Sequence, residues 1–107
     1  MALYYDLPVY RDTDRLVLRI FEVTKDFPKE YKFTLGQDMK RDALQCVRWL
    51  YRANKATQKK VHLDNFLDEF ELLKLEIRLC RDLEVLSLKK QAEISLLMDS
   101  IGKQVTG

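Results

Sequence analysis

Hydrophobic residues recur every three or four positions in four long segments of the chain, which is the spacing of amphipathic helices. The four predicted helices cover residues 7–25, 30–55, 62–86 and 88–106 of the 107-residue sequence. Because short connections between long helices place sequence neighbours antiparallel, this pattern predicts an all-α, up-down-up-down four-helix bundle. We expect one domain over residues 1–107, with no internal repeat and no second domain.

Helix-breaking residues mark the ends of these segments. Asp6 precedes Leu7-Pro8 and is expected to cap the first helix, with the proline in its first turn. Pro28 ends the first pattern, since the residue before a proline avoids the α region. Residues 57–60 form a polar connector, and Ser87 can cap a last helix that begins near Leu88.

The third segment differs from the others because it is hydrophobic on two sides. One stripe contains Leu63, Phe66, Leu67, Phe70, Leu73, Ile77 and Cys80. A second stripe, nearly opposite, contains Leu72, Leu75, Leu79, Leu83 and Leu86 and has the three- and four-residue steps of a coiled-coil seam. Such a helix is buried on both sides, either centrally within its own chain or against another subunit. We favour the second arrangement, because no fifth helix exists to cover the five leucines, and they would form an unusually large apolar patch.

Positive charge is concentrated in one part of the sequence, although the net charge is only +2. Residues 31–62 carry eight Lys and Arg against two acids, whereas residues 63–86 carry seven acids against three Lys and Arg. On the second predicted helix, a row of basic side chains falls within about 60° of arc, opposite the hydrophobic face. The row consists of Arg41, Arg48, Arg52 and Lys55, with Trp49 at its margin.

Further basic residues lie beside this row in sequence or step along the first helix. They are Lys59 and Lys60 in the connector, and Arg11, Arg15 and Arg19 at four-residue steps. Guanidinium groups bind phosphates in a bidentate manner, and an aromatic ring can stack on an unpaired base. These ten residues are therefore the candidate nucleic-acid contacts. An ordinary solvated helix face, or recruitment of an acidic protein partner without any nucleic acid, would also account for the charges.

Catalytic and metal-binding patterns are missing from the sequence. His62 is the single histidine, so neither a Cys₂His₂ zinc site nor a di-metal site built from two Glu-x-x-His motifs is possible. Cys46 and Cys80 lie on hydrophobic stripes and are expected to be buried, unreactive thiols. No glycine-rich phosphate loop occurs. We therefore expect no enzymatic activity, cofactor or metal.

Segments long enough to cross a membrane are missing as well, since no hydrophobic run approaches about 20 residues. The first residues do not combine a basic stretch with a following apolar one, as a signal peptide does. The cytoplasm is the expected location.

Several short segments resemble a known family of small four-helix bundles, which includes proteins encoded in rRNA intervening sequences. They are Asp6-Leu-Pro-Val-Tyr10, Phe27-Pro-Lys-Glu-Tyr31, Leu35-Gly-Gln-Asp-Met39, Lys40-Arg-Asp-Ala-Leu44 and the leucine-rich stretch from Phe70 to Leu83. Within that family the chain is most similar to the accessory variability determinant (Avd) of diversity-generating retroelements. Ala53-Asn54-Lys55-Ala56 departs from the Asn-Ile-Ala-Glu-Gly-like run of the intervening-sequence branch, which disfavours that branch.

The resemblance implies a homopentameric barrel of four-helix bundles with a basic surface. It also implies association with the reverse transcriptase of the retroelement and with template RNA or DNA during mutagenic retrohoming. These motifs are structural, so no individual residue role is carried over from the family. The expected function is that of a non-catalytic accessory protein, and the alternative is a protein-interaction adaptor with no nucleic-acid role.

Overall fold

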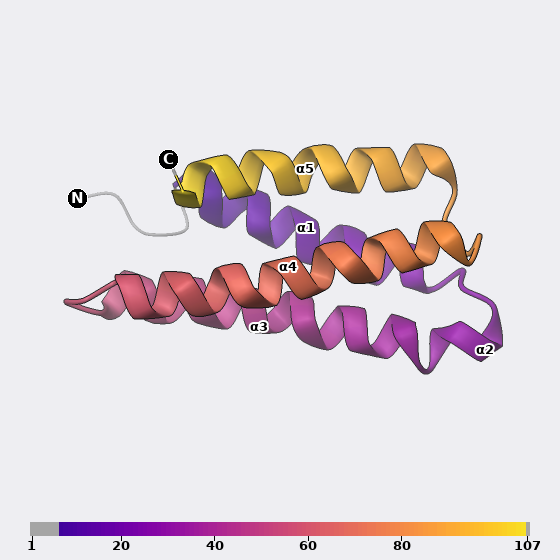
Figure 1. The fold of residues 1–107 in the computed structure, drawn as a ribbon, viewed down its shortest axis with the longest axis horizontal. Helices are drawn as coiled ribbons and strands as arrows, with labels where there is room; N and C mark the ends of the chain where they lie inside the picture. The colour runs from indigo at the N-terminus through magenta and orange to yellow at the C-terminus, as the bar shows by residue number, and fades with distance from the viewer. Residues whose placement is uncertain (1–6, 107) are drawn as a thin grey trace.

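The fold consists of four long helices and one short one, in a computed structural model that describes residues 7–106. The helices are α1 (Pro8–Thr24), α2 (Lys29–Lys32), α3 (Leu35–Lys55), α4 (Lys60–Asp82) and α5 (Leu88–Thr106). The long helices lie alongside one another in a molecule of 44 × 22 × 19 Å (Figure 1). The connection from α3 to α4 lies at one end, and α2 and the connection from α4 to α5 lie at the other. The prediction of an all-α fold with four long helices is confirmed.

Two helix boundaries follow the sequence prediction closely. Pro8 occupies the first turn of α1, where its missing N–H costs nothing. The predicted capping residue Asp6 lies outside the described residues. At the start of α5 the Ser87 hydroxyl accepts a hydrogen bond from the backbone N–H of Lys90, at 3.2 Å, as expected for a cap.

The second predicted helix is in fact two helices, and this part of the prediction is wrong. The backbone leaves helical geometry at Phe33 and Thr34, between α2 and α3. Gly36 permits the sharp step, because a Cβ atom there would lie 3.3 Å from the carbonyl oxygen of Tyr31 and 3.5 Å from the ring of Phe27. The glycine therefore serves close packing at the corner between the two helices.

The third predicted helix is also shorter than expected, since α4 ends at Asp82 and not at residue 86. Glu84 adopts a left-handed conformation, with φ of 59°. The N–H of Val85 donates to the carbonyl of Cys80 at 2.9 Å, and that of Glu84 donates to Arg81 at 3.0 Å. This pair of hydrogen bonds is a Schellman motif, which normally has glycine or asparagine at the left-handed position. The sequence has glutamate at this position, so it gives no indication that the helix ends there.

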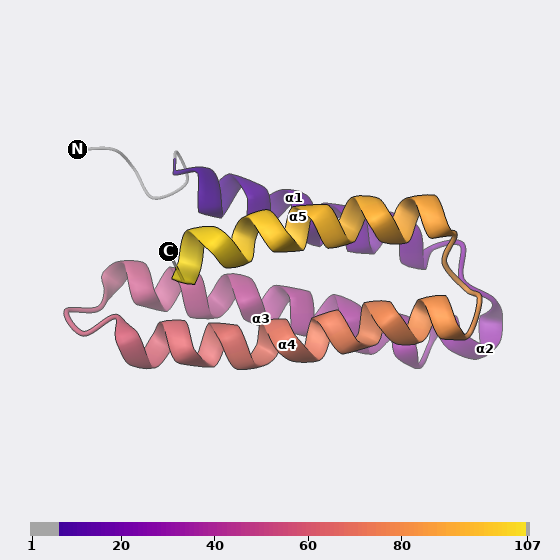
Figure 2. The same ribbon diagram turned by 45° about the horizontal axis from the view of Figure 1, so that its top comes forward.

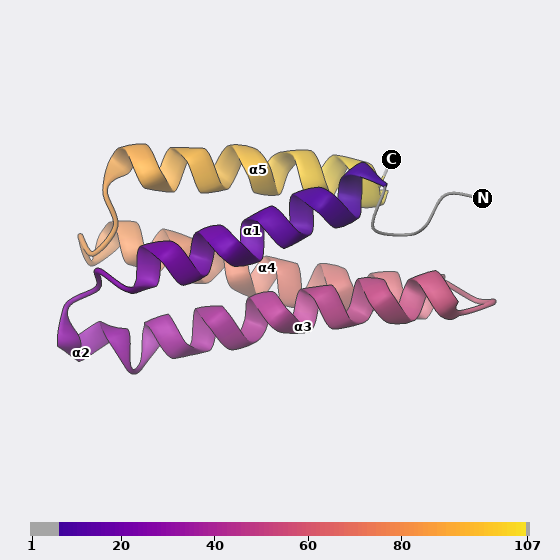
Figure 3. The same ribbon diagram turned by 180° about the vertical axis from the view of Figure 1, so that it is seen from behind.

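The hydrophobic core lies between α1, α3, α4 and α5. Its members are Leu16, Ile20, Met39, Ala43, Cys46, Phe66, Phe70, Leu73, Ile77, Cys80, Ile94, Met98 and Ile101. The rings of Phe66 and Phe70 stack with their centroids 5.1 Å apart. Both cysteines are buried as free thiols, as expected, and burial raises the pKa of each to about 12. α4 and α5 form one side of the bundle (Figure 2), and α1 and α3 face the viewer on the opposite side (Figure 3).

Candidate nucleic-acid interface and assembly surface

The basic row on α3 contains three cations without an acidic partner. Arg48, Arg52 and Lys55 are exposed, and none forms an ion pair with any residue between 7 and 106. The Arg52 guanidinium lies 4.9 Å from the centroid of the Trp49 ring, and Lys55 Nζ lies 4.3 Å from that of Tyr51. These contacts orient the two side chains without neutralising their charge.

Arg41 belongs to the same row but is neutralised within the chain. Its guanidinium forms ion pairs with Asp38 at 3.3 Å and Asp42 at 3.4 Å. The charge of Asp42, followed by that of Asp38, raises the pKa of Arg41 above its ordinary value. The two acids of this segment therefore both lie at the N-terminal end of the row, where they neutralise Arg41.

Trp49, the predicted base-stacking residue, is half-buried between α3 and α4. Its ring stacks on the ring of His62, with centroids 6.3 Å apart and an angle of 27° between the planes. The Arg52 guanidinium lies over the same ring, so a base that stacked on Trp49 would compete with both neighbours.

The two lysines of the connector have structural partners. Lys59 Nζ donates to the carbonyl oxygens of Ala53, Asn54 and Ala56, at 2.8, 3.4 and 3.2 Å. It thereby satisfies carbonyls at the end of α3, where a positive charge is also favourable. Lys60 forms an ion pair with Asp64 at 2.8 Å, and the hydrogen bond to Asp64 raises the pKa of the Lys60 amine.

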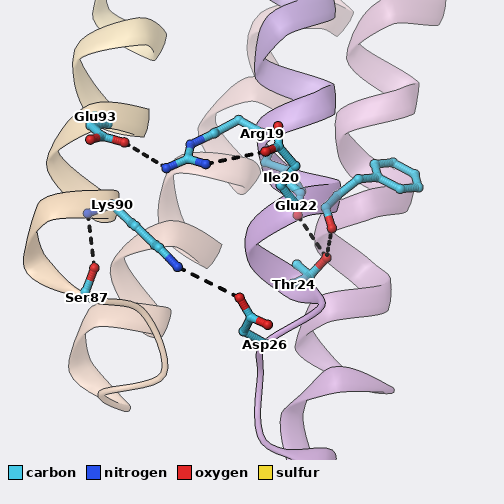
Figure 4. Close-up of polar contacts among 9 residues, drawn as sticks. Arg19, Ile20, Glu22, Thr24, Asp26, Ser87, Lys90 and Glu93 are labelled. Atoms are coloured by element: carbon cyan, nitrogen blue, oxygen red, sulfur yellow. Dashed lines mark hydrogen bonds and ion pairs between the residues drawn. The ribbon is translucent and has the colours of Figure 1, made fainter.

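The arginines of α1 are mostly paired. Arg15 lies 3.6 Å from Asp12, and Arg19 lies between Glu22 at 3.7 Å and Glu93 of α5 at 2.8 Å. Figure 4 shows Arg19 spanning these two carboxylates, with the Lys90–Asp26 pair below it. Arg11 is exposed and forms no ion pair within the described part of the chain. Among the ten candidate residues, the cations with neither an acidic partner nor a backbone carbonyl partner within residues 7–106 are therefore Arg11, Arg48, Arg52 and Lys55.

A line of exposed leucines runs along the outer side of α4. Leu72, Leu75, Leu79 and Leu83 are 40–43% exposed. Leu86 does not continue the line, because the chain has left the helix after Asp82 and turns this side chain into the core, where it is 7% exposed. The expectation that Leu86 belongs to an exposed stripe is therefore wrong. The other four leucines form an apolar strip that stays partly exposed among the described residues.

A seam of buried polar atoms separates the leucine line from the basic row. Five side-chain atoms at the junction of α3 and α4 have no hydrogen-bond partner within residues 7–106: Asp42 Oδ2, Trp49 Nε1, His62 Nδ1, Glu69 Oε2 and Glu76 Oε1. They recur every seven residues along each helix, so they share one side of it. Sequence analysis missed this seam because its members are scattered between the hydrophobic and charged faces of the two helices.

A further set of cations, on α4, was also missed. Lys74, Arg78 and Arg81 line a hollow between α4 and α5 with a volume of about 310 Å³. In the sequence they fall within the segment of net negative charge. In the folded structure Arg78 and Arg81 have no acidic partner within residues 7–106, whereas Lys74 pairs with Glu71 at 3.4 Å.

Metal-binding clusters are not found in the described part of the chain: residues 7–106 contain no group of three His, Cys, Asp or Glu side chains placed to hold an ion. Within the same range, no helix has the length and hydrophobicity needed to span a bilayer.

Fold and surface together define a four-helix-bundle protein with a basic helix face and an exposed leucine line. A family model described as bAvd-like matches residues 9–107, which is nearly the whole chain. The chain belongs to the bAvd-like family. No curated protein matches it.

Proposed function

We propose that this protein is a non-catalytic accessory protein of a diversity-generating retroelement. In this role it forms a homo-oligomer, a pentamer by its resemblance to Avd, of antiparallel up-down-up-down bundles. The oligomer presents basic surface to the reverse transcriptase and to template RNA or DNA in the cytoplasm, without a cofactor or metal. Membership of the bAvd-like family over residues 9–107 is the observation that carries this proposal.

The basic row on α3 supplies the nucleic-acid contact in this proposal. Arg48, Arg52 and Lys55 project from one helix face and have no acidic partner within residues 7–106, so their charges are available to phosphates. Each neutralised phosphate releases condensed counterions and strengthens binding. Repetition of the row in an oligomer multiplies the number of such contacts on one strand.

The leucine line supplies the assembly contact. Four leucines that are each 40–43% exposed in a single chain follow one another at three- and four-residue steps along α4. Contact with a second copy would remove this surface from water, with a gain of about 25 cal/mol for each Å² buried.

Charge reversal on α3 tests the nucleic-acid role. In the double variant Arg48→Glu/Arg52→Glu we expect at least a tenfold loss of affinity for single-stranded RNA at low salt, with helicity and assembly unchanged. Reversal of two other exposed, unpaired lysines, Lys29→Glu/Lys89→Glu, removes the same charge elsewhere and serves as the control. Equal affinity of the wild type and the α3 variant would overturn the role of this row.

The salt dependence of binding separates nucleic-acid recognition from a pure adaptor function. A protein that contacts phosphates loses affinity linearly in a plot of log K against log salt, with a slope of about −0.7 for each phosphate on a single strand. A wild-type protein that binds no RNA or DNA at low salt, yet captures a protein partner through α3, would favour the adaptor. Co-purification tests whether the reverse transcriptase is a partner. We expect the enzyme to co-purify with the wild type and not with variants of the leucine line or the α3 row.

A further inference from the structure

A groove with an excess of positive charge runs along the junction of α4 and α5. Its first hollow, of about 310 Å³, is lined by Lys74, Arg78 and Arg81 from α4 and by Gln91, Ser95 and Asp99 from α5. A second hollow, of about 280 Å³, shares Lys74 and Asp99 with the first and extends toward Lys103 and Thr106. Because they share these two residues, the two hollows are adjoining parts of one groove between α4 and α5.

Two of the three groove cations have no acidic partner within the described residues. Arg78 and Arg81 are exposed, and neither forms an ion pair with a residue between 7 and 106. Lys74 is half-buried over the Phe70 ring at 5.2 Å, with Glu71 at 3.4 Å. In the first hollow Asp99 is the single acid among the lining residues, against three cations.

Spacing places the three cations in a line that suits an extended anion. Residues at i, i+4 and i+7 lie on one side of a helix, and seven residues rise by about 10 Å. Two of the three are arginines, whose planar guanidinium groups bind phosphate oxygens in pairs. The α4 wall of the groove is therefore a row of phosphate-binding groups.

Apart from Asp99, the α5 side and the base of the first hollow are uncharged. On α5 the Gln91 side-chain amide donates to the Ser95 hydroxyl at 3.2 Å, which leaves further donors and acceptors for a ligand. At the base, Ile77 and Met98 are each 2% exposed and apolar. A hollow of this volume is at the small end of ligand sites.

We infer that the α4–α5 groove binds the backbone of a single nucleic-acid strand. Phosphates lie along Lys74, Arg78 and Arg81, and sugars or bases lie against Gln91, Ser95 and the apolar base. This site is separate from the α3 row, and the inference rests on the proposed function insofar as the protein binds nucleic acid at all.

Neutralisation of the two groove arginines tests the inference. The probe is a fluorescently labelled single-stranded RNA oligonucleotide, titrated with the full-length protein at several salt concentrations. For Arg78→Gln/Arg81→Gln we expect at least a tenfold loss of affinity and a decrease of about 1.4 in the salt slope, the value for two phosphate contacts. The matched control Lys29→Gln/Lys89→Gln removes two unpaired charges outside the groove and should change affinity by less than about threefold.

Removal of the groove acid gives an effect of opposite sign. Asp99→Asn should tighten binding several-fold, because the strand no longer meets a carboxylate in the groove. Asp14→Asn removes an exposed acid on α1 and is the control. Circular dichroism and light scattering confirm that each variant keeps its helices and its mass.

The outcomes separate this inference from the proposed function. If the wild type binds the oligonucleotide and Arg78→Gln/Arg81→Gln behaves like its control, the groove is not a strand-binding site, while the α3 row can still be one. If the wild type does not bind at low salt, both the inference and the nucleic-acid part of the proposed function are overturned. Photocrosslinks from 4-thiouridine to residues 74–81 and 91–99 would support the groove, and crosslinks confined to α3 would contradict it.

Discussion

The carboxyl groups of Asp42 on α3 and Glu76 on α4 lie within hydrogen-bonding reach of each other and are both buried, at 4% and 6% exposure. Burial raises the pKa of Glu76 to about 8, and the hydrogen bond to Asp42 and the charges of Asp42 and Asp38 act in the same direction. The nearby Arg41 guanidinium opposes them. Near neutral pH, Glu76 is therefore protonated, and its proton gives Asp42 Oδ2 and Glu76 Oε1 the partner that both atoms lack while the two carboxyls are ionised.

This arrangement predicts that stability decreases as the pH rises. Between the ordinary pKa of 4.5 and the folded value of about 8, the native state holds a proton on Glu76 that the unfolded chain has released. Stability should fall by up to roughly 1.4 kcal/mol for each pH unit in this window, and level off above it. Urea unfolding between pH 5 and 9 measures the slope. Glu76→Gln, which keeps the donor without the titration, should abolish this fall.

A matched substitution identifies the source of the effect. Glu30 is exposed on α2, and Glu30→Gln should leave the pH dependence of the wild type unchanged. A fall in stability that persists in Glu76→Gln would show that another group is responsible.

The leucine line gives a prediction about mass in solution. Leu75→Arg/Leu79→Arg places two charges in the centre of the line, and desolvating them against a partner subunit is costly. We expect the oligomer to dissociate to monomers, as measured by light scattering. Leu18 and Leu96 are more exposed, at 62% and 70%, and Leu18→Arg/Leu96→Arg should keep the wild-type mass. An unchanged mass for the Leu75→Arg/Leu79→Arg variant would show that the leucine line is not part of the subunit interface.

Lys59 is expected to contribute to stability more than to binding. Its ammonium group satisfies three carbonyl oxygens at the end of α3, and Lys59→Met leaves them to water. The expected loss is about 1 kcal/mol of unfolding free energy, measured in urea. Lys29→Met, which loses an unpaired surface charge, should be nearly neutral. The RNA affinity of Lys59→Met should decrease no more than that of the Lys29→Met control. A larger decrease would show that Lys59 contacts nucleic acid.

Glu84 carries backbone strain that can be removed. With φ of 59° it occupies the left-handed position of the Schellman motif after α4, which disfavours side chains with a Cβ atom. Glu84→Gly should therefore raise the unfolding free energy by about 0.5–1 kcal/mol, seen as a higher midpoint in thermal unfolding. Glu84→Ala keeps the Cβ atom and loses only the charge, so it should not stabilise. Equal gains from both variants would assign the effect to charge.

The four long helices and the buried stripe of α4 followed directly from hydrophobic spacing, because periodicity reports which side of a helix is buried. The break at Thr34 and the end of α4 at Asp82 did not, since the first depends on packing of Gly36 against Tyr31 and the second on a left-handed Glu84. Leu86 was misplaced for the same reason: extrapolation of the helix put it on the outside, whereas the turn puts it inside.

The candidate site shows the same limit. Sequence spacing correctly placed Arg48, Arg52 and Lys55 on an exposed face of α3. It could not show that Arg19 reaches Glu93 on a helix 74 residues away, or that Lys59 folds back onto α3. Nor could it find the α4–α5 groove, because a hollow exists only once two distant helices are packed.

Helix α4 has three faces with different roles. One face contributes core side chains, another carries the leucine line, and the third carries the groove cations. Few of its positions are free to change without loss of folding, assembly or charge. Neutral substitutions should instead accumulate on the outward faces of α1 and α5, at positions such as Asp14 and Lys89. Saturation mutagenesis would accordingly divide the molecule into one intolerant helix and two permissive ones.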